Sequence, residues 1–94
     1  MAAEALVIRP GEDTVAVVTE NIRKGEQVLC RSGKKTFEIT ALSDIPIYHK
    51  IALKDMKKGE KVIKYGCPIG KLLENVKKGE YIHIHNLGRM EEEE

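Results

Sequence analysis

The sequence of 94 residues is poor in aromatic side chains, with no Trp, one Phe and three Tyr. Aliphatic side chains must therefore build most of the core, and few rings are available on which nucleic-acid bases could stack. Sixteen basic and fifteen acidic residues leave a net charge of +1, which is far from the excess that a phosphate backbone requires. We therefore expect no nucleic acid among the partners of this protein.

Long apolar runs and paired cysteines are also missing. No run approaches the roughly 20 apolar residues of a membrane helix, and the N-terminus lacks the pattern of a secretory signal. Cys30 and Cys67 form no Cys-x-x-Cys pair and indicate no disulfide framework. We expect a cytoplasmic protein that contacts no membrane. The length fits one small domain, which favours a binding module or one chain of a two-chain enzyme.

Charge is distributed unevenly along the chain. Residues 1–47 carry a net charge of −1, residues 48–90 carry +6 together with all three histidines, and residues 91–94 are all Glu. We therefore expect residues 48–90 to attract anions. The predicted organisation is one domain over residues 1–90, followed by a disordered acidic tail over residues 91–94.

One short pattern occurs three times: Asx, an apolar residue, two basic residues, Gly, Glu, any residue and a β-branched residue. The copies are residues 21–28, 55–62 and 75–82. Asx side chains favour the start of turns, Gly provides a left-handed backbone position, and the apolar residues that follow are typical of a strand. Because the copies are unevenly spaced, they argue against a solenoid and indicate a recurring corner in an irregular β fold.

The remaining segments predict short strands. We expect strands at residues 5–8, 14–19, 28–31, 36–41, 50–53, 61–65 and 81–86. Residues 32–35 are typical of a hairpin turn, and residues 69–74 could form one short helical turn. The expected fold class is therefore all-β, a small single domain of short strands.

The sharpest chemical signal is the pair His83 and His85, which alternate with Ile82 and Ile84 along the last predicted strand. Both imidazoles would then lie on one face, about 6.5 Å apart. They could bind one metal ion or one anionic ligand, but structural zinc needs four ligands and this chain has no carboxylate near them. Another chain would have to complete a metal site. The alternative is a half-exposed strand with polar residues facing water.

Two other features could carry chemistry. His49 follows a turn-like stretch, and a histidine there suits acid–base work or carboxylate binding. Residues 63–70 contain two glycines and a proline, so they predict a shaped loop whose backbone N–H groups could hold an anion. The loop spacing matches neither a Walker loop nor a dinucleotide fingerprint. A loop histidine without a role and a tight structural turn are the alternatives.

Taken together, these features resemble a known family. Residues 45–87 are similar to the N-terminal domain of the altronate and galactarate dehydratase family, and residues 1–44 match it more loosely. The resemblance rests on the combination of His49-Lys50, Ile63-Lys64-Tyr65-Gly66, Pro68-Ile69-Gly70 and His83-x-His85-Asn86. It implies a β-clip fold of the SAF type, named for antifreeze proteins and sialic acid synthases.

The resemblance also implies a function. The expected role is the small subunit of a two-component carbon–oxygen lyase (a hydro-lyase) that dehydrates a sugar acid of the altronate or galactarate type. Its expected partners are a large catalytic subunit and a small anionic hydroxy acid. The expected catalytic residues are His49, His83 and His85, and the expected substrate-binding residues are Lys50, Lys64, Tyr65, Gly66 and Asn86. A divalent metal such as iron would be held mainly by the partner, with His83 and His85 as candidate ligands.

Other functions stay open. The chain could be the alpha subunit of (2R)-sulfolactate sulfo-lyase, a carbon–sulfur lyase that expels sulfite instead of water. It could also be a non-catalytic SAF module that binds an anionic ligand, or a purely structural β domain. The residues of this sequence do not distinguish the two leaving groups.

Overall fold

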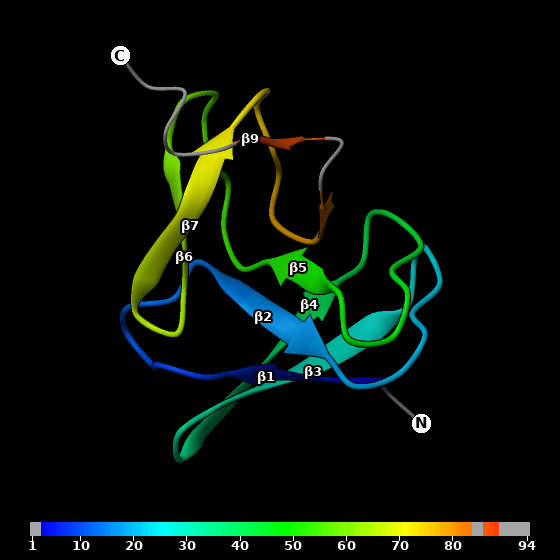
Figure 1. The fold of residues 1–94 in the computed structure, drawn as a ribbon. Coiled ribbons are helices and arrows are strands. Elements are labelled where there is room, and N and C mark those ends of the chain that lie inside the picture. Colours follow the sequence, from blue (N-terminus) through cyan, green and yellow to red (C-terminus); the bar gives the residue numbers. More distant parts are fainter. Residues whose placement is uncertain (1–2, 84–85, 89–94) are drawn as a thin grey trace.

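The computed structural model describes residues 3–83 and 86–88, and in this part of the chain it contains nine short strands and no helix (Figure 1). The strands are β1 (Ala3–Val7), β2 (Val15–Val18), β3 (Gln27–Ser32), β4 (Lys35–Thr40), β5 (Lys50–Ala52), β6 (Lys61–Lys64), β7 (Cys67–Leu72), β8 (Tyr81–Ile82) and β9 (Leu87–Gly88). The predicted all-β fold class is confirmed. Residues 91–94 and part of the predicted last strand lie outside the described residues.

The strands form two sheets. The larger sheet has the order β4-β3-β1-β2-β5-β8, in which β1 and β3 are parallel and the other neighbours antiparallel. The smaller sheet has the order β6-β7-β9 and stands above the larger one in Figure 1. Two apolar clusters fill the interior, one along the larger sheet and one between the two sheets. Their buried apolar side chains are aliphatic or sulfur-containing, as the shortage of aromatic residues requires.

The smaller sheet departs from the prediction. The expected helical turn at residues 69–74 is wrong, because most of that segment belongs to β7, and the expected loop over residues 63–70 is the hairpin of β6 and β7. Tyr65 and Gly66 both have positive φ, 58° and 73°, which is the geometry of a two-residue hairpin turn. The other predicted hairpin, at residues 32–35, is confirmed between β3 and β4.

Among residues 3–83 and 86–88, the repeated segment forms four corners, one more than the sequence pattern indicates. Corner 1 is residues 21–28, corner 2 residues 44–51, corner 3 residues 55–62 and corner 4 residues 75–82. The corners lie in antiparallel pairs, because Ile22 of corner 1 pairs with Ile45 of corner 2 and Met56 of corner 3 pairs with Val76 of corner 4. The fold therefore repeats one local structure four times.

Side chains join the two corners of each pair. The Asx side chain of every corner accepts a hydrogen bond from a backbone N–H of its paired corner. These bonds run from Ile47 to Asn21, Lys24 to Asp44, Lys78 to Asp55 and Lys58 to Asn75, and each is 2.8 or 2.9 Å long. The expected turn-forming role of Asx is confirmed, with the difference that each side chain acts on the neighbouring corner.

Corners 1, 3 and 4 also have hydrogen bonds within the corner, between a glutamate side chain and the backbone. Their glycines are Gly25, Gly59 and Gly79, with φ of 90°, 88° and 97°. Their glutamates are Glu26, Glu60 and Glu80, and each carboxylate accepts a hydrogen bond of 2.7 to 3.0 Å from the backbone N–H three residues earlier. In these three corners, the shared backbone path thus depends on a left-handed glycine and a backbone-capping carboxylate.

Candidate functional site

Corner 2 follows the same backbone path with different residues. His49 N–H bonds the Pro46 carbonyl at 3.1 Å, as the glutamate N–H does in the other corners. Yet Tyr48 stands where the others have Gly, and His49 stands where they have Glu. Pro46 stands at the residue whose N–H the glutamate would cap, and proline has no N–H. Position 49 therefore has no backbone donor to satisfy, so its side chain is available for other contacts.

Tyr48 adopts the left-handed backbone conformation with φ of 70°. This conformation costs a non-glycine residue about 1–2 kcal/mol. The Tyr48 side chain is 71% exposed, so burial of its ring does not offset that cost. Two backbone hydrogen bonds hold the conformation, from Tyr48 N–H to the Val18 carbonyl and from Val18 N–H to the His49 carbonyl. Such retained strain is common at functional sites.

His49 lies in a ring cluster with Tyr81 and His83. The Tyr81 hydroxyl is 2.7 Å from His49 Nδ1. The ring centroids of His49 and His83 are 4.6 Å apart, and the rings of Tyr81 and His83 are stacked at 5.7 Å. The antiparallel pairing of β5 with β8, which places Ile51 opposite Tyr81, brings these residues together.

The structure therefore unites two of the three predicted catalytic histidines and adds Tyr81, which the sequence did not single out. The third, His85, lies outside the described residues. The roles of all three stay predictions. Tyr81 occupies the variable position of the repeat, so only the pairing of distant strands could have identified it.

The side chain of Asn86 fixes the backbone of Tyr81 and His83, which carry two of the three rings. The side chain is 1% exposed. Its Oδ1 accepts a hydrogen bond from His83 N–H at 3.0 Å, and its Nδ2 donates to the Tyr81 carbonyl at 2.9 Å. These bonds orient the backbone of both ring residues. The predicted contact of Asn86 with substrate stays a prediction, and these bonds already use one acceptor site and one donor of its buried amide.

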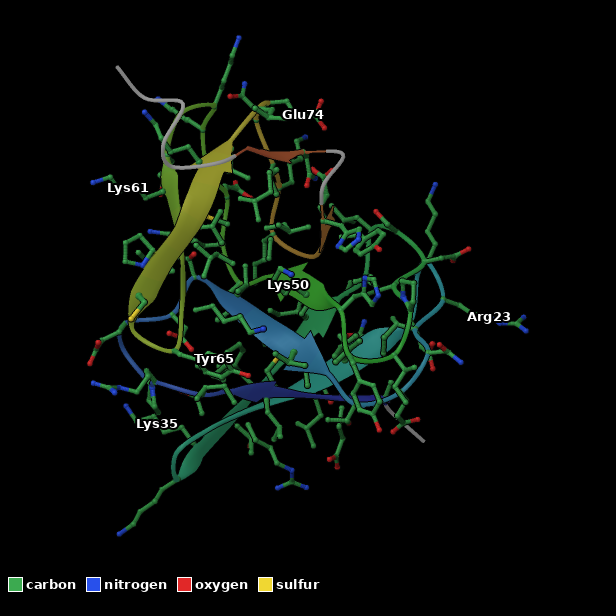
Figure 2. All side chains as sticks on the ribbon, in the orientation of Figure 1. Arg23, Lys35, Lys50, Lys61, Tyr65 and Glu74 are labelled. Carbon is green, nitrogen blue, oxygen red and sulfur yellow. The ribbon has the colours of Figure 1, made fainter. Side chains whose placement is uncertain are left out.

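Lys50 and Lys64 form a second, separate feature. Burial lowers the pKa of Lys50 below its usual value of 10.5, and the positive charge of Lys64 lowers it further. Within the described part of the chain, neither lysine forms an ion pair. Figure 2 shows Lys50 near the middle of the molecule and Lys61, the equivalent residue of corner 3, at its outer edge. Two neighbouring ammonium groups without a paired carboxylate can attract an anion.

Tyr65 and Gly66 lie beside this lysine pair, at the turn between β6 and β7. Lys64 Nζ is 4.8 Å from the centroid of the Tyr65 ring, a cation–π contact. Gly66 N–H donates a hydrogen bond of 2.8 Å to Asp13 Oδ1. A carboxylate of this chain thus occupies the amide that was expected to hold an anion, and substrate binding by Tyr65 and Gly66 stays a prediction.

The described residues do not fit a complete metal site. Among residues 3–83 and 86–88, no group of three His, Cys, Asp or Glu side chains is placed to hold a metal ion. His49 and His83 bring two imidazoles together, and no carboxylate of the described residues completes a group of three with them. The same part of the chain has no helix that is long and apolar enough to span a membrane.

The strands, paired corners and ring cluster define a small all-β domain of the β-clip class. The family model of the altronate/galactarate dehydratase SAF domain matches residues 3–90. The chain belongs to this family, as the residues around His49, Gly66 and His83 led us to expect.

Individual relatives agree with the family. The chain is 32% identical over 84 residues to the (2R)-sulfolactate sulfo-lyase subunit alpha of Chromohalobacter salexigens, covering 86% of this chain and 89% of the relative. It is 47% identical over 55 residues to the same subunit of Paracoccus pantotrophus, covering 58% and 82%. It is 38% identical over 74 residues to the altronate dehydratase of Escherichia coli, covering 79% of this chain but only 14% of that enzyme. These matches indicate a lyase subunit or a lyase domain.

Proposed function

We propose that this chain is the small subunit of a two-component lyase that removes water from a sugar acid of the altronate or galactarate type. The observation that carries the proposal is the pair of imidazoles of His49 and His83, whose ring centroids are 4.6 Å apart. His49 lies in the corner that departs from the repeat. Hydroxide is a poor leaving group, so a dehydration needs a proton donor at the departing oxygen. Imidazoles near neutral pH suit that task.

The elimination takes a proton from the carbon next to a carboxylate and expels a hydroxyl from the neighbouring carbon. It needs a base, stabilisation of the charge that develops on the carboxylate, and an acid for the hydroxyl. In our proposal His49, His83 and His85 face the active site of the partner and bind or protonate the substrate. Lys50 and Lys64 supply positive charge that attracts the anionic substrate. We assign the expected divalent metal mainly to the partner, because the described donors form no complete set.

A second candidate is the alpha subunit of (2R)-sulfolactate sulfo-lyase. It is supported by the extent of the match, because this chain matches 89% of the relative with that name. Sulfite is a stabler leaving anion than hydroxide, so its departure depends less on a proton donor. The two candidates therefore predict different sensitivity to loss of the imidazoles.

The test reconstitutes the full chain with a large subunit, which we expect to co-purify with it. We expect turnover of altronate or galactarate only when both chains are present. His49→Gln and His83→Gln should each lower kcat by about 10²- to 10⁴-fold, the usual contribution of a general acid or base. Glu60→Gln, at the position equivalent to His49 in corner 3, keeps a carbonyl acceptor for the corner and should leave turnover unchanged.

Three outcomes would redirect the assignment. Turnover of sulfolactate, with small losses in both histidine variants, would favour the second candidate. Calorimetric binding of a sugar acid by the chain alone, without turnover in any reconstituted pair, would favour a non-catalytic module. Full dehydration activity in the histidine variants would contradict the proposed role of the imidazoles.

A further inference from the structure

We infer that Tyr81 is a positioning residue, whose hydroxyl holds His49 in the form that carries its proton on Nε2 and makes it a hydrogen-bond donor to the substrate. This inference rests on the proposed function for its consequence in catalysis. Its structural part concerns two side chains of this chain alone. Tyr81 is not among the candidate catalytic or substrate-binding residues predicted from the sequence.

The first support is geometric. The Tyr81 hydroxyl and His49 Nδ1 are 2.7 Å apart, and the described residues make no other hydrogen bond to the His49 ring. A phenol keeps its proton at neutral pH and can donate it, whereas a neutral imidazole has one donor and one acceptor nitrogen. When Tyr81 donates, Nδ1 is the acceptor and Nε2 carries the proton. Nε2 then donates a hydrogen bond, which suits an anionic oxygen of a carboxylate.

The second support is the position of Tyr81 in the repeat. Tyr81 belongs to corner 4, and the equivalent residues of the other corners are Gln27, Lys50 and Lys61. None of these is aromatic. The corner that carries an aromatic residue at this position is the one that reaches His49, the residue that replaces the glutamate of corner 2. The aromatic residue at this variable position and the histidine that replaces a glutamate, 32 residues apart in the sequence, thus meet in a single hydrogen bond.

The third support is that Tyr81 is held firmly. Its carbonyl accepts a hydrogen bond from Asn86 Nδ2, its ring packs against the core cluster of the larger sheet, and it stacks on the His83 ring at an angle of 8°. A residue whose backbone is hydrogen-bonded and whose ring is packed on two sides can orient a neighbour without large loss of conformational freedom. His49 is then assigned to hold substrate oxygen, and the base that removes the carbon-bound proton lies elsewhere.

The structural part is tested by nitrogen NMR of the full chain, with labelled histidine, at a pH where imidazoles are neutral. We expect His49 with Nδ1 unprotonated and Nε2 protonated, and a through-bond correlation between the Tyr81 hydroxyl proton and His49 Nδ1. Tyr81→Phe should abolish that correlation while the backbone amide spectrum elsewhere stays that of the parent. Tyr48→Phe, which removes an exposed hydroxyl of corner 2, should preserve it. A protonated Nδ1 in neutral His49, or no correlation in the parent, would overturn the inference.

The catalytic part is tested in the reconstituted pair. Tyr81→Phe should lower kcat by roughly 10- to 100-fold, as misplacement of a catalytic group does, with a smaller change in KM. If His49→Gln abolishes turnover but Tyr81→Phe does not change it, the positioning role is wrong and the proposed function stands. If the NMR correlation is present but neither variant changes turnover, the proposed role of His49 is wrong and the hydrogen bond is only structural.

Discussion

Corner 2 and corner 3 have the same backbone path but differ in the side chains that hold it. In corner 3, Gly59 accepts the left-handed conformation without strain, and Glu60 caps the N–H of Lys57 at 3.0 Å. In corner 2 the same two positions hold Tyr48 and His49. Corner 2 therefore lacks the unstrained glycine and the carboxylate cap, and we expect its conformation to be less stable than that of corner 3.

Pro46 explains why the exchange is tolerated. A glutamate in the other corners satisfies one backbone N–H, and a proline at that position has no N–H to satisfy. The imidazole of His49 therefore turns toward Tyr81 instead of toward its own backbone. A local rule of the fold is broken at one corner and kept at three, which is typical of a functional site.

The largest effect on the free energy of unfolding should come from adding a Cβ at a glycine of corner 3 or corner 4. A Cβ at Gly79 would overlap the carbonyl oxygen of Thr40, whereas a Cβ at Gly59 meets nothing within 4 Å. Gly79→Ala should lower the free energy of unfolding by about 3 kcal/mol or more, which combines left-handed strain with overpacking. Gly59→Ala should lose only about 1–2 kcal/mol. Urea unfolding measures both, and equal losses would show that the Thr40 contact is unimportant.

A smaller effect should appear when corner 2 is converted toward corner 3. Pro46→Lys restores the backbone N–H, and His49→Glu supplies the carboxylate that would cap it. In a double-mutant cycle by urea unfolding, we expect a favourable coupling of about 0.5–1.5 kcal/mol between the two changes, the net value of one hydrogen bond. Pro46→Lys combined with His49→Ala is the matched control and should show no coupling. Coupling near zero in the first cycle would mean that the carboxylate caps contribute little.

These differences also explain what the sequence could predict. Corners 1, 3 and 4 were recognisable because Gly and Glu act within a few residues of each other. Corner 2 keeps Asp44, Ile45 and Ile51 at the repeat positions, but the residues that define the pattern are replaced, so only this partial match could have indicated it.

The missed elements depend on contacts between distant segments. The role of Tyr81 follows from the pairing of β5 with β8, which no local pattern encodes. β7 was missed because Pro68 and Gly70 interrupt the strand pattern, and Gly70 is required where a Cβ would overlap the Gly88 carbonyl oxygen. The all-β class, the candidate histidines and the family could be predicted from the sequence, because they depend on composition and on short motifs.

The smallest effect should separate Lys50 of corner 2 from Lys61 of corner 3. Burial, and then the charge of Lys64, lowers the pKa of Lys50 in the folded chain below 10.5. The folded state therefore carries an unfavourable charge at pH 7, and this penalty disappears as the pH rises from the lowered pKa to 10.5. Lys50→Met should raise the free energy of unfolding at pH 7, by less than about 1 kcal/mol because solvent screens a half-exposed group.

The pH dependence of stability shows whether charge or packing separates Lys50 from Lys61. The stability gap between Lys50→Met and the parent should narrow as the pH approaches 10.5, since the parent loses its buried charge there. Lys61→Met, at the exposed equivalent position, should match the parent across the whole range. A gap that stays constant with pH would mean that side-chain packing, not charge, separates the two lysines. A gap that narrows, together with weaker substrate affinity in the reconstituted pair, would show that corner 2 keeps an unfavourable charge for the sake of binding an anion.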